Sequence, residues 1–124
     1  MKAIFTEKAP SPAGHYSQAM VSGRMVFVSG QLPIHPESGE IEASIEEQTQ
    51  QVINNLENIL IASGSSLENV LKTTVYISDI SLWAKVNAMY AERFGSHKPA
   101  RAVVPTRDLH FGCLIEVEAV AELA

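Results

Sequence analysis

The sequence predicts a single α+β domain in which two helices pack on one face of a mixed β-sheet. Three observations favour this fold class. The chain has 124 residues, enough for one hydrophobic core and too few for two, so residues 1–124 are expected to form one domain. Hydrophobic residues make up 46% of the chain, which is typical of a folded protein. Apolar, β-branched segments and segments of helical periodicity follow one another in the order β-β-β-α-β-α-β-β.

Three strands are expected before the first helix. Residues 17–21 and 25–31 form a hairpin through Ser22-Gly23. The second strand of this hairpin is apolar and partly β-branched, which favours a central position in the sheet. A short strand at residues 2–6 is expected to pair beside the hairpin.

The first helix is predicted to begin after Ser44, because Ser44-Ile45-Glu46-Glu47 has the spacing of a capping box. Gly64 provides the stop at its C-terminal end. Between these signals, apolar residues recur on one helical face: Ile45, Val52, Ile53, Leu56, Ile59 and Leu60. A stripe of this kind is typical of core packing, and we assign it no chemistry.

The second half of the chain reads as strand, helix, strand, strand. Residues 70–78 are rich in β-branched side chains and predict a strand. Ser81 is expected to cap a helix over residues 82–94. The residues expected to face inward from this helix are Leu82, Val86, Met89, Tyr90 and Phe94. Strands are expected over residues 100–106 and 113–123, the latter with period-two alternation.

Composition restricts the function. Two helices leave one sheet face uncovered, and charged residues make up only 19% of the chain, so we expect an oligomer. The net charge of -5 disfavours nucleic acid as a partner. With one cysteine, no signal-peptide core and no apolar run of membrane-spanning length, we expect a cytoplasmic protein that has no membrane partner.

Cofactor motifs are missing from the sequence. Neither of the two common glycine-rich phosphate-binding loops occurs. The four histidines show no helical i, i+4 pairing, so we expect no metal site and no cofactor. Cys113 is interpreted as a small buried hydrophobic residue and not as a nucleophile.

Two charged residues are candidates for chemistry. Arg101 lies at the entrance of an apolar strand, where a charge needs a partner. That partner is either a carboxylate of the protein, in a structural ion pair, or the carboxylate of a ligand. Glu116, Glu118 and Glu122 share one face of the last strand. For Glu118 and Glu122 a solvated edge is the simplest interpretation, whereas Glu116 could also hold or activate a water molecule.

Seven segments, in order along nearly the whole chain, carry a resemblance. They are Gly14-His15-Tyr16-Ser17-Gln18, Val28-Ser29-Gly30-Gln31-Leu32-Pro33, Glu47-Gln48-Thr49, Lys72-Thr73-Thr74-Val75, Val86-Asn87-Ala88-Met89-Tyr90, Pro99-Ala100-Arg101 and Ile115-Glu116-Val117-Glu118-Ala119. With these segments the sequence resembles the Rid family of reactive intermediate deaminases, also called YjgF-like proteins. It departs from the best-studied branch at Ala102-Val103, at Leu109-His110-Phe111-Gly112 and at His15.

The resemblance implies a chorismate-mutase-like subunit and a homotrimer with clefts between subunits. It implies hydrolysis of 2-imino acids, in equilibrium with 2-aminoacrylate-type enamines, to 2-keto acids and ammonia. No cofactor is implied, and the link to pyridoxal-phosphate enzymes is functional, without a stable complex. Arg101 matches the arginine that binds the substrate carboxylate, and Glu116 matches the acid that positions the water. Four more residues match the substrate-binding cleft: Tyr16, Ser29, Gly30 and Asn87.

Two other functions remain open at this point. The same cleft could bind 2-keto acids without catalysis and act as a regulatory module. An RNA-cleaving translation inhibitor is the third hypothesis, against which the negative charge and the absence of a basic cluster argue.

Overall fold

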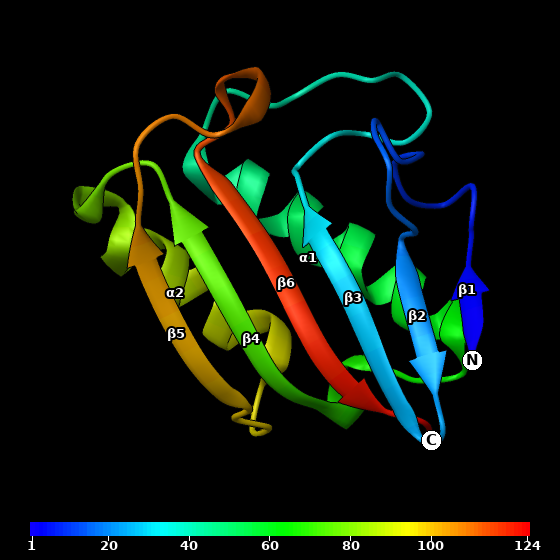
Figure 1. The fold of residues 1–124 in the computed structure, drawn as a ribbon. Helices are drawn as coiled ribbons and strands as arrows, with labels where there is room; N and C mark the ends of the chain where they lie inside the picture. Colours follow the sequence, from blue (N-terminus) through cyan, green and yellow to red (C-terminus); the bar gives the residue numbers. More distant parts are fainter.

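The computed structural model describes all 124 residues and confirms the predicted fold class (Figure 1). One six-stranded sheet has the order β1-β2-β3-β6-β4-β5, and both helices cover the same face of it. The strands are β1 (Lys2–Ile4), β2 (Ala19–Ser22), β3 (Met25–Gln31), β4 (Val70–Ile77), β5 (Ala100–Pro105) and β6 (Ile115–Glu122). The helices are α1 (Ile45–Ser63) and α2 (Trp83–Phe94), with short 3₁₀ turns η1 (Leu67–Asn69), η2 (Ile80–Leu82) and η3 (His110–Gly112).

The sheet is mixed, as predicted. β4 and β5 run parallel, and every other pair of neighbouring strands is antiparallel. The prediction of a central position for β3 is confirmed, because β3 pairs with β2 on one side and β6 on the other. The hairpin turn is displaced by one residue from its expected place: Ser22 pairs with Met25, so the turn is formed by Gly23-Arg24, and Gly23 takes a positive φ of 58°.

Local signals set both ends of α1. The Ser44 hydroxyl accepts a hydrogen bond from the Glu47 N–H at 3.1 Å and donates one to the Glu47 carboxylate at 2.9 Å. The first bond is one half of the predicted capping box, whereas in the second the Glu47 carboxylate accepts from the Ser44 hydroxyl and not from the Ser44 N–H. Gly64 ends the helix with a φ of 87°, a conformation that favours glycine.

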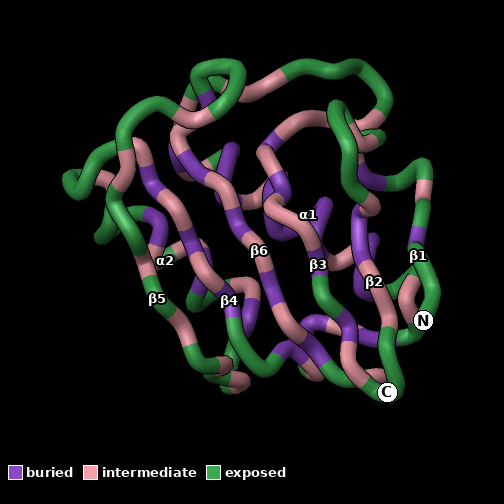
Figure 2. Tube along the Cα trace, viewed as in Figure 1, coloured by how far each residue is buried: buried purple, intermediate pink, exposed green.

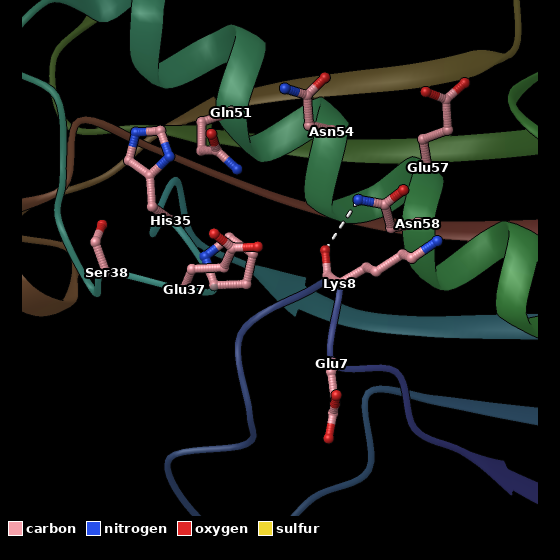
Figure 3. Close-up of a pocket in the computed structure, with 10 residues that line it drawn as sticks. Glu7, Lys8, His35, Glu37, Ser38, Gln51, Asn54, Glu57 and Asn58 are labelled. Atoms are coloured by element: carbon pink, nitrogen blue, oxygen red, sulfur yellow. Dashed lines mark hydrogen bonds between the residues drawn. The ribbon is translucent and has the colours of Figure 1, made fainter.

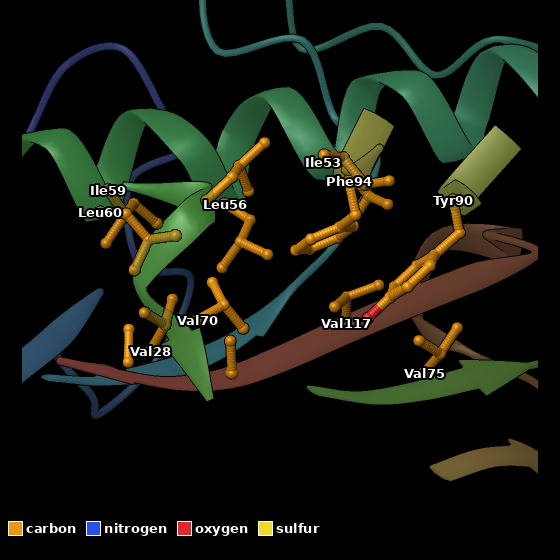
Figure 4. Packing of buried hydrophobic residues seen from close by; sticks show 14 of the residues in the cluster. Val28, Ile53, Leu56, Ile59, Leu60, Val70, Val75, Tyr90, Phe94 and Val117 are labelled. Carbon is orange, nitrogen blue, oxygen red and sulfur yellow. The ribbon is translucent and has the colours of Figure 1, made fainter. Parts of the chain in front are cut away.

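The predicted apolar stripe of α1 forms the centre of the core. All six of its residues are buried, and Figure 4 shows Ile53, Leu56 and Leu60 directed from the helix toward the sheet. Tyr90 and Phe94 of α2 extend the same layer, and their rings are stacked with the ring centres 4.4 Å apart. Burial of each large apolar side chain contributes about 1.5–3 kcal/mol, so this layer is the main source of stability.

Two predicted element starts are wrong. Asp79, and not Ser81, is the capping residue before α2, because its carboxylate accepts from the Ser81 N–H at 2.8 Å and starts turn η2. β6 begins at Ile115 because turn η3 occupies the preceding residues, so Cys113 does not open the strand. Cys113 is nevertheless buried, as predicted.

The sheet face opposite the helices has no cover within the chain. β6 alternates buried and less buried residues along its length (Figure 2). Glu116, Glu118 and Glu122 occupy the less buried positions, which belong to the uncovered face. Glu118 therefore lies in the middle of the sheet and not at an edge, because β6 pairs with strands on both sides. On neighbouring β3, Phe27 is 49% exposed on the same face. Neither helix has the length and apolar character needed to cross a membrane.

Candidate functional site

Glu116 and Gly30 meet on the uncovered face of the sheet. Gly30 lies between Val28 and Gln31, where the register of β3 with β6 shifts. The Glu116 side chain crosses over Gly30 so closely that a Cβ atom added to Gly30 would collide with Glu116 Oε2 and lie 3.2 Å from Cδ. The backbone φ of Gly30 is not positive. The approach of Glu116, and not a turn, is therefore what requires glycine here.

The surroundings of Glu116 raise its pKa. Its side chain is half-buried, and burial disfavours the charged form; the carboxylate of Glu118 acts in the same direction. His110 has a smaller effect that lowers this pKa. Glu118 accepts a hydrogen bond from the Tyr76 hydroxyl at 2.7 Å. A carboxylate with a raised pKa accepts a proton from water more readily than an ordinary glutamate does.

Ser29 and Tyr16 lie beside this pair. The Ser29 hydroxyl donates to the Ser17 carbonyl at 2.6 Å, and the Ser29 N–H donates to the Gln18 carbonyl at 3.0 Å. These bonds hold β3 against the segment that carries Tyr16. Tyr16 is 48% exposed, and its side chain lines the same small cavity as Gly30.

Arg101 belongs to the opposite face of the sheet. It pairs in register with Thr73 of β4, on the side where α2 packs. Its guanidinium donates to the Asn87 side-chain oxygen at 3.0 Å. The guanidinium carbon also lies 4.9 Å from the centre of the Tyr90 ring and 5.9 Å from that of Trp83. Asn87 and the two rings thus hold the guanidinium in one orientation.

No carboxylate of the chain pairs with Arg101. The three ion pairs of the structure join other residues, so the structural ion pair that the sequence left open does not form within the chain. Arg101 instead borders a cavity of about 440 Å³ at the start of β5, where Asn87, Tyr90 and Pro99 are among its neighbours. A planar guanidinium with free N–H groups is suited to binding a carboxylate at two points.

Arg101 and Glu116 do not meet within one chain. On β4, Arg101 is level with Thr73, whereas Glu116 is level with Tyr76. Three residues correspond to about 10 Å along a strand, and β4 lies between β5 and β6. The two side chains also point to opposite faces. The structure therefore forms two groups, one of Glu116, Gly30, Ser29 and Tyr16 and the other of Arg101 and Asn87.

Two aromatic residues join the Arg101 group without having been identified from the sequence. Helical periodicity predicts Tyr90 only as a core residue, and no motif singles out Trp83. Their spacing from Asn87, three residues after and four before, places all three on one face of α2. Once Asn87 is assigned to the site, this helical spacing is the sequence signal that could have identified Trp83 and Tyr90 as its neighbours.

The largest hollow of the molecule lies elsewhere. It measures about 790 Å³ and is open to solvent between α1, the start of the chain and the loop after β3 (Figure 3). Apart from Pro36, the residues that line it are polar or charged: Glu7, Lys8, His35, Glu37, Ser38, Gln51, Asn54, Glu57 and Asn58. It shares no residue with either group above, and no buried side-chain polar atom of the structure lacks a partner. We assign it no ligand.

Comparisons with known sequences agree on one family. The model of the family described as endoribonuclease L-PSP matches residues 6–123. A RutC family protein of Pyrococcus abyssi is 52% identical over 119 residues, which cover 95% of this chain and 94% of the relative. The chloroplastic Reactive Intermediate Deaminase A of Arabidopsis thaliana is 40% identical, with coverage of 97% and 65%. The mitochondrial protein Mmf1 of Saccharomyces cerevisiae is 41% identical, with coverage of 95% and 81%.

Solved structures share the complete fold. The YjgF gene product of Escherichia coli superimposes with a TM-score of 0.95 at 38% identity, with 98% of each chain covered. Escherichia coli TdcF, crystallised with bound serine, gives a TM-score of 0.96 at 35% identity over the whole of both chains. The match includes the strands and helix that carry both groups of residues.

Proposed function

Since this chain belongs to the endoribonuclease L-PSP family, the YjgF or Rid proteins, we propose that it is a hydrolytic deaminase of 2-imino acids. Its substrates are imines of the 2-iminopropanoate and 2-iminobutanoate type and the 2-aminoacrylate-type enamines in equilibrium with them. The products are 2-keto acids and ammonia. A relative named as a reactive intermediate deaminase supports deaminase activity, and the serine bound to TdcF supports a ligand with an amino-acid carboxylate.

This proposal depends on one observation: the guanidinium of Arg101 is held in place but has no carboxylate partner within the chain. Its guanidinium is fixed by Asn87 and by aromatic rings, and no carboxylate of the chain neutralises it. A half-buried cation held in one orientation is expected to take a small anionic ligand, and a 2-imino acid carries the matching carboxylate.

A second copy of the chain completes the site. Arg101 and Glu116 lie on opposite faces in one chain, so one small substrate reaches both only if they come from different subunits. Contact between the β5 edge of one subunit and the uncovered sheet face of the next is heterologous, and heterologous contacts form a ring when the rotation between neighbours closes. We infer a ring of three with three equivalent clefts, as the family resemblance implies.

The proposed reaction requires two side chains, one that binds the substrate and one that transfers protons. Arg101 of one subunit binds the carboxylate and fixes the position of C2. Glu116 of the neighbour accepts a proton from water as the water oxygen bonds to C2 of the protonated imine, and the electron pair of the C=N double bond moves to nitrogen, which becomes an amino group. Glu116 returns the proton to the amino group of this carbinolamine. The C–N bond breaks, ammonia leaves with the electron pair of that bond, and the hydroxyl proton passes to solvent water to give the keto acid.

The direct test is a coupled assay. A pyridoxal-phosphate dehydratase or an amino-acid oxidase generates the imine, and release of the keto acid is timed with and without the protein. We expect faster release with the parent, and a Glu116→Gln variant slower by about 10²–10⁴-fold because glutamine accepts no proton. Glu122→Gln on the same face of β6 is the matched control and should keep the parent rate. No acceleration by the parent protein would refute the proposal.

Mixing two defective variants tests the shared site. Arg101→Ala and Glu116→Gln subunits are each expected to be inactive alone. Mixed rings from equal amounts should recover about a quarter of the parent activity, because one interface in four pairs an intact Arg101 with an intact Glu116. No recovery in subunits shown to exchange would refute a site shared between chains.

Two alternatives give different results in the same experiments. A regulatory module would bind 2-keto acids but leave the rate of imine hydrolysis unchanged. The family description names an endoribonuclease, and that function predicts salt-sensitive binding and cleavage of RNA. The net charge of -5 argues against it.

The compartment and partners belong to the same proposal. We propose a cytoplasmic protein that removes imines released by pyridoxal-phosphate enzymes without forming a stable complex with them. The mitochondrial location of yeast Mmf1 shows that relatives work in other compartments. Localisation of a tagged full-length chain, together with co-purification, tests both points.

A further inference from the structure

Phe111 has an unusual backbone conformation. It is the only residue other than glycine with a positive φ, at φ 59° and ψ 23°. Large side chains rarely adopt this left-handed region because the Cβ atom crowds the backbone. The ring is 62% exposed, so burial in the core does not explain why the strained conformation persists. Strain of this kind is concentrated at functional sites.

The Phe111 ring forms part of a small cavity beside Gly30, on the uncovered sheet face that carries Glu116. The cavity measures about 50 Å³, and its lining comes from three segments: residues 10–16, residues 30–34 and turn η3. These segments converge at one end of the sheet, where β3 ends and β6 begins (Figure 1). Its apolar wall consists of Pro10, Ala13, Leu32, Ile34 and Phe111. The centre of the His110 ring lies 5.2 Å from the centre of the Phe111 ring.

Gly30 links this cavity to the proposed chemistry. Gly30 lines the cavity, and the carboxylate of Glu116 lies directly over Gly30. A 2-imino acid has three groups on C2. If the carboxylate is bound by Arg101 and the imine faces the water beside Glu116, the third group still needs a space, and the apolar cavity behind Gly30 adjoins Glu116.

We propose that Phe111 determines substrate specificity, its ring forming the wall of the pocket that receives the side chain of the imino acid. This inference rests on the proposed site. A cavity of about 50 Å³ is several-fold smaller than the roughly 300–1,000 Å³ of ordinary ligand pockets, so it admits only a short side chain. The protein therefore selects imines with methyl or ethyl side chains and rejects branched or aromatic ones.

The test compares substrates of different size. Imines from alanine, 2-aminobutyrate, leucine and phenylalanine are generated by an amino-acid oxidase, and kcat/KM is measured for each. We expect Phe111→Ala to raise kcat/KM for the leucine imine by about 10-fold or more relative to the alanine imine, the range that pocket contacts of this size supply. Phe111→Gly fits the left-handed backbone and keeps the turn in place if alanine disturbs it. Phe5→Ala removes an equally exposed ring elsewhere and should leave the size profile unchanged.

Binding provides a second readout that does not depend on catalysis. Trp83 is the only tryptophan and lies against Arg101, so its fluorescence should report binding of 2-keto acids of graded size. Hydrolysis with an unchanged size profile in both Phe111 variants would overturn this inference and leave the deaminase proposal standing. If no imine is hydrolysed but the Phe111 variants bind larger keto acids than the parent, the deaminase proposal fails and the pocket assignment stands. An unchanged size profile in binding as well would overturn the assignment in either case.

Discussion

A methyl group added at Gly30 should separate activity from stability. In Gly30→Ala the new Cβ occupies the space of Glu116 Oε2 and lies 3.2 Å from Cδ and 3.5 Å from Cγ. The carboxylate has to move by about 1 Å to reach ordinary contact distance. A misplacement of this size at a reacting group costs about 10²-fold in rate. We therefore expect kcat for imine hydrolysis to fall by about 10²-fold.

The fold should tolerate the same change. Gly30 does not have a positive φ, so alanine is conformationally allowed there. Replacing glycine by alanine under these conditions stabilises a protein by about 0.4–1 kcal/mol through the unfolded chain. Thermal unfolding of Gly30→Ala should thus occur at the parent temperature or slightly above it, because the only collision is with a side chain that can rotate away.

The assay pairs imine hydrolysis with thermal unfolding on one preparation. Gly14→Ala is the control, because its new Cβ would make an ordinary contact of 3.8 Å with the Tyr16 ring. In a Glu116→Gln background, the Gly30→Ala change should add little further loss, since both act through one carboxylate. A folded Gly30→Ala protein with the parent kcat would refute the assignment of Glu116 as the base.

Two further predictions concern charge. Arg101→Lys should restore little of the activity lost in Arg101→Ala, because an ammonium lacks the planar two-point geometry of a guanidinium. In a keto-acid titration, Arg101→Ala should bind about 10- to 150-fold more weakly than the parent, which corresponds to a loss of about 1.5–3 kcal/mol in binding free energy. Equal affinity of the lysine variant and the parent would contradict this. Glu116 must be ionised to accept a proton, so kcat/KM should fall as the pH drops through a pKa above the ordinary 4.5. Glu118→Gln removes a charge that raises this pKa and should move the acid limb to lower pH, whereas His110→Gln should move it to higher pH.

Much of the fold could be predicted because its signals are local. The capping box at Ser44 and the glycine stop at Gly64 act within one helical turn, and both helix ends are where the sequence predicts them. The start of β6 could not be predicted in the same way. Residues from Cys113 onward have strand periodicity, but β6 begins only at Ile115 because turn η3, with its left-handed Phe111, precedes it. Strand periodicity gives no information on such a turn.

The candidate site could be predicted as a set of residues but not as an arrangement. Alternation along the last strand correctly separates the face of Glu116 from the core face. The close approach of Glu116 to Gly30 depends on a register shift between two strands that lie far apart in sequence. The position of Arg101 against α2 likewise depends on the parallel register of β4 and β5. Pairing of distant strands leaves no signal in local spacing.

In the proposed site, the opposite orientation of Arg101 and Glu116 would also make the substrate a bridge between two subunits. A ligand held by Arg101 of one subunit and Glu116 of the next binds only the assembled form, so ligand affinity and subunit affinity are coupled and must raise each other by the same factor. Activity per chain should consequently decline on dilution, and saturating keto acid should delay that decline. A cell that accumulates imines would thereby stabilise the assembly that removes them.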